Sequence, residues 1–185
     1  MAMPCVSEIR TARLVLRPPP EADAPRIAEL AAVADVARMT GRLPHPYQMT
    51  DARDWLCYLS STQPEVAFAI TMSGDLVGVC GYNLTTDGKS AEIGYWQGKP
   101  FWAQGLATAA AKTLIRYGFT QNALDRVTVS HMTDNPASAA VIAKLGFRGT
   151  GRGLCSSLAR GAEVEANCYA LTRSQAEALP WYQAA

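Results

Sequence analysis

Residues 91–119 read AEIGYWQGKPFWAQGLATAAAKTLIRYGF, and residues 135–147 read NPASAAVIAKLGF. The first stretch predicts a strand, then a loop, then a helix that opens directly out of Gly105. The start of a helix leaves about four backbone N–H groups without partners and carries partial positive charge. Small residues at Gly105 and Ala107 let a phosphate approach those groups closely. Together with the second predicted helix, entered through Asn135, this pattern indicates a cofactor that carries a pyrophosphate.

The composition is that of an ordinary globular protein. The chain has 185 residues, of which 49% are hydrophobic and 18% charged, and its formal net charge is +1. This length suggests one domain, and the balanced charge gives no electrostatic argument for a nucleic-acid or membrane partner. No apolar run approaches the roughly 20 residues that span a bilayer, and the N-terminus shows no signal-peptide pattern. We therefore expect a cytoplasmic protein.

The cysteines and histidines form no metal-binding pattern. Only two histidines occur, His45 and His131, and no CxxC motif is present. The five cysteines are dispersed, at Cys5, Cys57, Cys80, Cys155 and Cys168. We expect reduced thiols and no metal cofactor.

Hydrophobic periodicity predicts alternating strands and helices along the whole chain. Strands are expected at residues 14–17, 66–71, 76–82, 90–96 and 126–130, and near 147–154 and 164–171. Helices are expected at residues 21–33, after an N-cap at Thr50, and at about 105–119 and 135–145. This order is a mixed α/β arrangement in which a β-meander leads into crossover units.

The order of elements and the two signature stretches resemble the GNAT superfamily of acetyl-CoA-dependent N-acetyltransferases. The TARLVLRP segment at residues 11–18 and the NPAS segment at residues 135–138 are most similar to its RimJ/RimL-type branch. The resemblance implies an α/β fold with a mixed, mostly antiparallel twisted sheet flanked by about four helices. It also implies a splay between the fourth and fifth strands. One such domain would occupy residues 1–185, with its core at about 11–172.

The resemblance implies where acetyl-CoA binds. The family pattern Gln/Arg-x-x-Gly-x-Gly/Ala matches residues 102–107, with Trp102 in the Gln/Arg position. Because this loop acts mainly through its main-chain N–H groups, the departure at Trp102 has little effect on the match. The pantetheine arm would lie in the splay, between the strand at 95–97 and the strand that ends near His131. The expected cofactor contacts are Tyr95, Trp96, Gln97, Trp102, Ala103, Gln104, Gly105, Leu106, Ala107, Thr108, Asn135 and Ser138.

The resemblance also implies a proton donor, and the residues themselves suggest a base, because a carboxylate is unusual in the middle of a strand. Many family members place a tyrosine acid in the second signature helix, where this chain has Val141. Ser138 is then the expected donor to the departing thiolate, as in RimL-like enzymes. Glu92 is the first-choice base for the amine proton, acting through water. Other candidates for this base are Asp134, His131 and Glu165.

The expected reaction is direct acetyl transfer from acetyl-CoA to a primary amine. We favour the α-amine of a peptide or protein N-terminus as the acceptor. The sequence also fits a small-molecule acetyltransferase that acts on an antibiotic, amino acid or polyamine, and a non-catalytic acyl-CoA sensor. A dinucleotide-dependent enzyme is disfavoured, because the glycines at 149, 151 and 153 lack the required spacing and no helix follows them. No motif specifies the acyl chain length or the oligomeric state.

Overall fold

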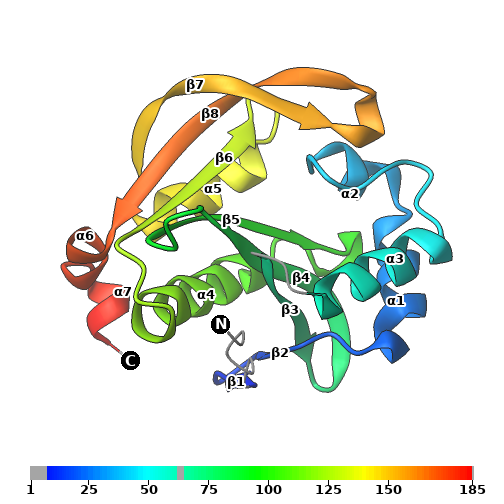
Figure 1. Ribbon diagram of the computed structural model, residues 1–185, viewed down its shortest axis with the longest axis horizontal. Coiled ribbons are helices and arrows are strands. Elements are labelled where there is room, and N and C mark those ends of the chain that lie inside the picture. The colour runs from blue at the N-terminus through cyan, green and yellow to red at the C-terminus, as the bar shows by residue number, and fades with distance from the viewer. Residues whose placement is uncertain (1–7, 62–64, 185) are drawn as a thin grey trace.

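The computed structural model describes residues 8–61 and 65–184 and contains one eight-stranded sheet with helices on both sides (Figure 1). The strands are β1 Ile9–Arg10, β2 Val15–Arg17, β3 Glu65–Met72, β4 Asp75–Leu84, β5 Ser90–Gln97, β6 Arg126–Met132, β7 Arg148–Ser157 and β8 Ala162–Thr172. Their order in the sheet is β1-β2-β3-β4-β5-β6-β8-β7, and only β5 and β6 pair in parallel. The mixed, mostly antiparallel sheet is therefore confirmed. The short strand β1 adds to the predicted set.

The described chain contains seven α-helices and three short 3₁₀ turns. The helices are α1 Ala24–Ala31, α2 Ala34–Arg38, α3 Met49–Ser60, α4 Leu106–Gln121, α5 Pro136–Leu145, α6 Arg173–Glu177 and α7 Pro180–Gln183. The 3₁₀ turns are η1 Glu21–Asp23, η2 Lys99–Phe101 and η3 Leu158–Arg160. The four longest helices, α1, α3, α4 and α5, match the predicted four; the others are short additions. Within the described ranges, no helix has the length and apolar character needed to cross a membrane.

Two helix predictions need correction. The helix predicted at 21–33 consists of η1 and α1 and ends at Ala31; Val33 then adopts an extended backbone before the separate helix α2. The predicted N-cap Thr50 lies inside α3, and Gln48 is the N-cap instead. The Asp51 carboxylate accepts the Gln48 backbone N–H at 2.6 Å, so a capping box of Gln48 and Asp51 fixes the start of α3.

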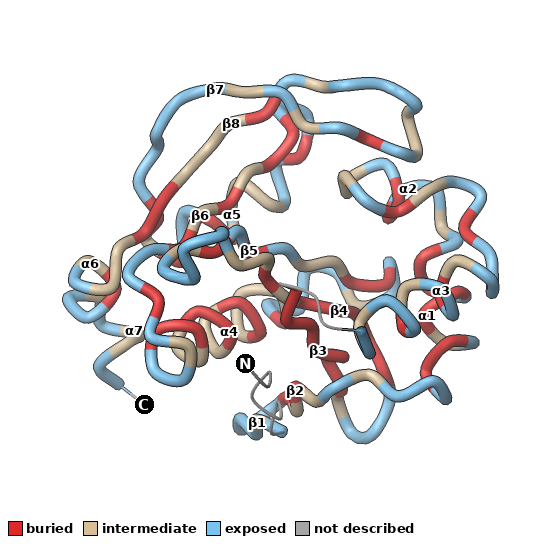
Figure 2. The backbone as a smooth tube through the Cα atoms, in the orientation of Figure 1, coloured by how far each residue is buried: buried red, intermediate tan, exposed pale blue. Residues whose placement is uncertain are grey.

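One side of the sheet packs on α4 and α5. Val66, Phe68 and Ile70 alternate along β3 and join a fully buried cluster with Leu106 and Leu114 of α4. Because side chains alternate along a strand, these β3 residues share one face. Figure 2 shows the same contrast along the chain: β3 and the inner side of α4 are buried, whereas β7 is mostly exposed.

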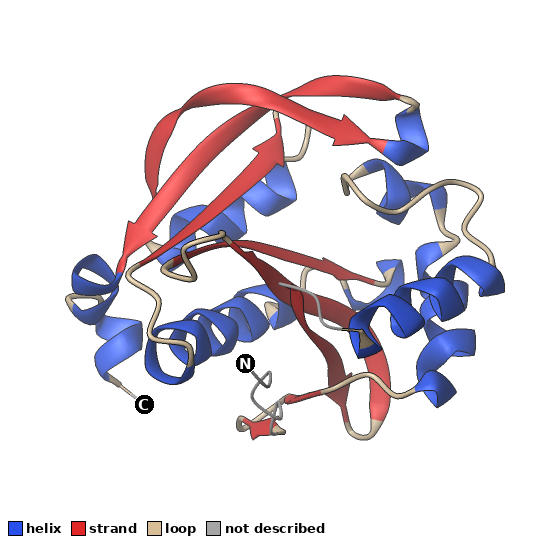
Figure 3. Ribbon diagram, viewed as in Figure 1, coloured by secondary structure: helices blue, strands red, loops and turns tan. Residues whose placement is uncertain are grey.

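The opposite side of the sheet packs on α1 and α3. Ala69 of β3 lies in a second buried cluster with Ile27 and Leu30 of α1 and Leu56 of α3. Figure 3 shows the two sets of helices on either side of the strands. The core is therefore a sheet between two helical layers, which holds the central strands β3, β4 and β5 rigidly.

The strands β5 and β6 separate after a short paired stretch. Their parallel pairing covers only residues 90–92 of β5 and 126–128 of β6. Beyond this contact, β5 continues to Gln97 and β6 to Met132, each still paired on its other edge, with β4 and β8 respectively. The strands connect through α4, the crossover helix that a parallel pair requires. The predicted splay between the fourth and fifth expected strands, which are β5 and β6, is confirmed.

The packing of the sheet on α4 predicts a large stability loss for Phe68→Ala. The Phe68 side chain has no exposed surface, and its ring meets Tyr117 of α4 edge to face at 5.3 Å between centroids. Truncating a buried phenylalanine removes about 3–5 kcal/mol from the free energy of unfolding. Urea denaturation measures this loss. The control Tyr58→Ala, at a 37% exposed position, is expected to change stability by about 0.5 kcal/mol at most. Equal losses in both variants would contradict the described core.

Candidate active site

The loop before α4 has the geometry of an open helix start. Gly105 is the N-cap of α4 and takes a left-handed backbone conformation, with φ of 75°. Glycine adopts this conformation without the steric penalty of other residues. No side chain caps the first turn of α4. A Cβ atom added at Gly105 would meet no heavy atom within 4 Å, so the space beside these N–H groups is open to a ligand.

Three side-chain hydrogen bonds hold this loop. The Trp102 indole Nε1 donates to the Gln97 carbonyl at 2.8 Å, which fastens the loop to the end of β5. The Gln104 side chain donates to the Pro100 carbonyl at 3.1 Å. The Arg13 guanidinium donates to the Gln104 carbonyl at 3.3 Å. Trp102, which replaces the family's Gln or Arg, therefore has a loop-fixing role of its own.

Arg13 is a residue that the sequence analysis did not single out for the site. It lies just before β2 and is exposed, and its contact brings a cation to the loop that precedes α4. The contact spans 91 residues of sequence, so no local pattern indicates it. A guanidinium retains N–H groups beyond the one that it donates here, and such groups suit a phosphate.

The three predicted contacts on β5 point in different directions. Trp96 packs against the cluster around α1 and α3, whereas Tyr95 packs against the cluster around α4. Gln97 follows Tyr95 by two residues and so shares its face. The Gln97 side chain is 7% exposed, and its amide nitrogen has no hydrogen-bond partner among the described residues. The Gln97 carbonyl is already occupied by Trp102.

Tyr95 and Ser138 meet across the splay. The Tyr95 hydroxyl lies 3.0 Å from the Ser138 Oγ, and either can donate. Ser138 lies in the first turn of α5, where its backbone N–H donates to the Asn135 Oδ1 at 3.0 Å. Burial raises the pKa of Tyr95, against a smaller lowering by the Ser138 hydrogen bond, so the phenol is protonated at neutral pH. The sequence assigned only main-chain roles to Tyr95 and missed this hydroxyl.

Glu92 occupies the last position at which β5 still pairs with β6. Its carboxylate is exposed and accepts a hydrogen bond from the Ser130 hydroxyl at 3.3 Å. Glu92 and Tyr95 are an odd number of residues apart, so their side chains project from opposite faces of β5. In register, Glu92 aligns with Asn83 of β4, which aligns with Glu65 of β3. In-register residues share a face, so these three form a polar row on the α1 and α3 side of the sheet.

The outer end of this polar row is fixed by an ion pair. The Arg42 guanidinium donates to Glu65 Oε2 at 2.7 Å, and the Trp55 indole donates to Glu65 Oε1 at 3.4 Å. Glu65 is buried, whereas Arg42 is largely exposed. Because both Glu65 oxygens have partners, Glu92 is the carboxylate of the row that is open to solvent.

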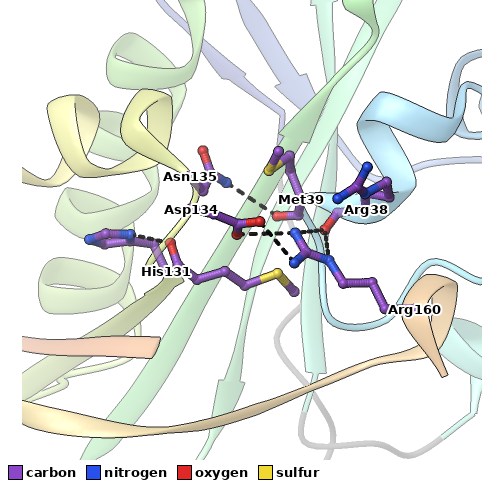
Figure 4. A network of polar contacts seen from close by, with 7 residues as sticks. Arg38, Met39, His131, Asp134, Asn135 and Arg160 are labelled. Atoms are coloured by element: carbon purple, nitrogen blue, oxygen red, sulfur yellow. Dashed lines mark hydrogen bonds and ion pairs between the residues drawn. The ribbon is translucent and has the colours of Figure 1, made fainter. Parts of the chain in front are cut away.

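Two of the other three candidate bases have side-chain partners elsewhere. Asp134 accepts two hydrogen bonds from Arg160, at 2.9 and 3.1 Å, and these hold the pKa of Asp134 below its usual range (Figure 4). His131 is buried, with Nδ1 2.8 Å from the Met132 carbonyl and Nε2 3.2 Å from the Tyr169 hydroxyl. Because a carbonyl only accepts, Nδ1 carries a proton and donates it to the Met132 carbonyl. Glu165 is exposed on β8, and its carbonyl accepts the Thr133 N–H at 3.0 Å.

The described residues contain no group of three or more His, Cys, Asp or Glu side chains arranged to hold a metal ion. The four cysteines in the described ranges are free thiols, and Cys5 lies outside those ranges. Burial raises the pKa of the Cys155 thiol, and the nearby charge of Glu92 raises it further.

Comparison with known proteins gives consistent matches. The family model described as acetyltransferase (GNAT) domain matches residues 13–148. The chain is 30% identical over 132 residues to the putative ribosomal N-acetyltransferase YdaF of Bacillus subtilis, covering 71% of this chain and 72% of YdaF. It is 33% identical over 81 residues to the ribosomal-protein-serine acetyltransferase of Escherichia coli, covering 43% and 45% of the two chains.

Solved structures share the fold. A ribosomal L7/L12 alpha-N-protein acetyltransferase, RimL, in complex with coenzyme A, superposes with a TM-score of 0.81 at 21% identity, over 91% of this chain and 99% of that chain. RimJ of Mycobacterium smegmatis, solved with a CoA-disulfide, gives a TM-score of 0.81 at 23% identity, over 92% and 86%. At these identities, the likeness describes the fold alone.

A negative charge at Gly105 tests the predicted cofactor loop. Gly105→Glu is expected to weaken coenzyme A binding by about tenfold or more, because the carboxylate competes with phosphate at the helix start. Gly88 is a matched control, since it is also left-handed, with φ of 67°, and also has no heavy atom within 4 Å of an added Cβ. Both variants carry a similar backbone strain of roughly 1–2 kcal/mol. If calorimetry finds equal affinities of Gly105→Glu and Gly88→Glu for coenzyme A, the loop is not part of the cofactor site.

Proposed function

The chain belongs to the GNAT family of N-acetyltransferases, and from this premise we propose that it transfers acetyl from acetyl-CoA directly to the α-amine of a peptide or protein N-terminus. The observation that carries this proposal is the Tyr95–Ser138 hydroxyl pair at the point where β5 leaves β6. The pair brings a proton donor to the gap in which the thioester would lie. The names of the relatives above, which refer to ribosomal proteins, support a protein acceptor.

Acetyl-CoA would enter from the α4 side of the sheet. Its pyrophosphate would accept hydrogen bonds from the main-chain N–H groups at the open start of α4, with the Arg13 guanidinium beside it. The edge of β5 beyond Glu92 has no strand partner among the described residues, so the pantetheine amides can hydrogen-bond there as an added strand would. The buried, unpartnered Gln97 amide nitrogen is a further donor on that side.

The reaction begins when the neutral amine attacks the carbonyl carbon of the thioester. A C–N bond forms, the carbonyl oxygen becomes an oxyanion, and main-chain N–H groups at residues 95–97 stabilise it. The C–S bond then breaks as the Ser138 hydroxyl hydrogen-bonds to the departing sulfur. When Tyr95 is the donor of the two hydroxyls, the Ser138 proton is free to face the sulfur. The proton released by the amine ends on the coenzyme A thiol, so the reaction is balanced without another reactant.

Glu92 is the best-placed base for the amine proton. It is an exposed carboxylate with a single hydroxyl donor, on the face of β5 opposite Tyr95. The Asp134 carboxylate is paired with Arg160, and both ring nitrogens of His131 are already engaged. The acceptor would therefore approach from the polar row of Glu65, Asn83 and Glu92, on the face opposite the cofactor. Water between the amine and Glu92 completes the proton path.

The energetics favour an α-amine over a lysine side chain. Deprotonating a lysine ammonium with pKa near 10.4 costs roughly 4.6 kcal/mol at pH 7, whereas an α-amine near 7.8 costs about 1.1 kcal/mol. An exposed carboxylate that acts through water, such as Glu92, is consistent with the smaller cost.

Removing the Ser138 hydroxyl tests the donor. Ser138→Ala is expected to lower kcat by about 100-fold, within the range for general acid catalysis, and to change acetyl-CoA affinity little. Tyr95→Phe should lower kcat as well, and the double variant should be no slower than the slower single variant, because the two hydroxyls act as one unit. Tyr58→Phe, at an exposed position, is the control. A Ser138→Ala enzyme within about twofold of wild type would assign the role to another group.

Paired peptides test the acceptor. One short peptide has a free N-terminus and no lysine, and the other has a blocked N-terminus and one lysine. The free N-terminus should be acetylated faster, because the lysine requires about 3.5 kcal/mol more assistance from the site. Initial rates of coenzyme A release measure the difference. Equal or faster turnover of the blocked peptide would exclude the α-amine preference and leave the acetyltransferase assignment intact.

A further inference from the structure

Three segments that are distant in sequence meet beside the polar row. They are the loop at residues 38–42, the turn at Asp134 and Asn135 between β6 and α5, and η3 at the tip of the β7–β8 hairpin. Figure 4 shows Arg160 of η3 between the other two segments. We refer to the contacts of Arg160 with Asp134 and with Arg38 as the loop clamp.

The loop clamp uses all three nitrogens of the guanidinium group. Arg160 Nη1 and Nη2 donate to the two Asp134 oxygens at 2.9 and 3.1 Å. Arg160 Nε and Nη2 donate to the Arg38 carbonyl at 3.1 and 2.9 Å. The Arg160 side chain is 17% exposed, so it is more enclosed than a typical surface arginine. A planar fork that serves two acceptors fixes direction as well as distance, which a lysine cannot do.

Asn135 links the clamped loop to Ser138. Its Oδ1 accepts the Ser138 backbone N–H at 3.0 Å and so fixes the first turn of α5. Its Nδ2 donates to the Met39 carbonyl at 3.4 Å, in the loop next to Arg38. One amide therefore touches both the helix that carries the proposed proton donor and the loop that Arg160 holds.

The clamped loop also borders the polar row. The Gly41 carbonyl accepts a hydrogen bond from the Leu158 N–H at 3.0 Å, which is a second contact between the loop and the hairpin. Arg42, the next residue, is the ion-pair partner of Glu65 at the outer end of the row. A Cβ added at Gly41 would lie 2.8 Å from the Ser156 carbonyl and 3.3 Å from the Cys155 sulfur, so the loop packs closely on β7. The loop and the hairpin thus meet above the face that carries Glu92.

We propose that Arg160 and Asp134 are positioning residues for the acceptor. They hold the loop at 38–42 over the polar row. Through Asn135, they also fix the position of this loop relative to Ser138. This inference rests on the proposed function, because it takes the polar-row face as the acceptor side. Neither residue touches the reacting atoms.

The test compares two arginines with the same bidentate geometry. Arg17 of β2 pairs with Asp23 at 2.7 and 2.9 Å, and β2 lies near the edge of the sheet opposite the β7–β8 hairpin. Arg160→Lys and Arg17→Lys each keep the charge and remove the fork. In Arg160→Lys, KM for the peptide acceptor should rise by about tenfold, as expected for the loss of one charge-assisted hydrogen bond, and kcat should fall. The Kd for acetyl-CoA by calorimetry should stay within about twofold of wild type.

Asp134→Asn should reproduce the Arg160→Lys pattern, and the double variant should be no worse than either alone, because both break the same contact. Arg17→Lys should leave acceptor KM unchanged. An unchanged acceptor KM in Arg160→Lys, or an equal rise in Arg17→Lys, would overturn the positioning role. A wild-type protein that binds acetyl-CoA but acetylates no peptide would instead overturn the proposed function, and the present inference with it.

Discussion

The short parallel contact between β5 and β6 is the constraint on which the rest of the site depends. Only residues 90–92 and 126–128 pair, and the strands then separate. An unpaired strand edge inside a domain is normally costly, because buried backbone groups need partners. Here each strand keeps a full ladder on its other side, β5 with β4 and β6 with β8. The gap is therefore a stable feature of the fold and leaves one edge of β5 available to a ligand.

Helices and side chains define the two ends of this gap. The open start of α4 supplies main-chain donors at one end, and Trp102 and Arg13 hold the loop that leads to it. At the other end, Tyr95 and Ser138 meet across the gap. Because Glu92 projects from the opposite face of β5, the two partners of the proposed reaction would meet at the sheet edge from opposite sides. A cofactor that fills the gap would then separate acceptor binding from pyrophosphate binding.

The sequence predicts those parts of the site that depend on local pattern. The helix opening at Gly105, the cap at Asn135 and the strand alternation that orders β5 are all visible from spacing and residue type. The parts that it misses are contacts between distant segments: Tyr95 with Ser138 across 43 residues, and Arg160 with Arg38 across 122. Such pairs depend on how the sheet curves and on how the β7–β8 hairpin returns over it, which no local window contains. The role of Ser138 came from the family resemblance and that of Glu92 from its place within a strand, and both remain predictions.

The most direct test of this account is a crystal structure of the protein with coenzyme A and an N-terminally acetylated peptide product. We expect the coenzyme A sulfur within hydrogen-bonding distance of Ser138 Oγ, the pantetheine amides along the free edge of β5, and the acetylated nitrogen on the Glu92 side of the sheet. A sulfur far from Ser138, or a peptide bound on the same face as the cofactor, would contradict the central claim.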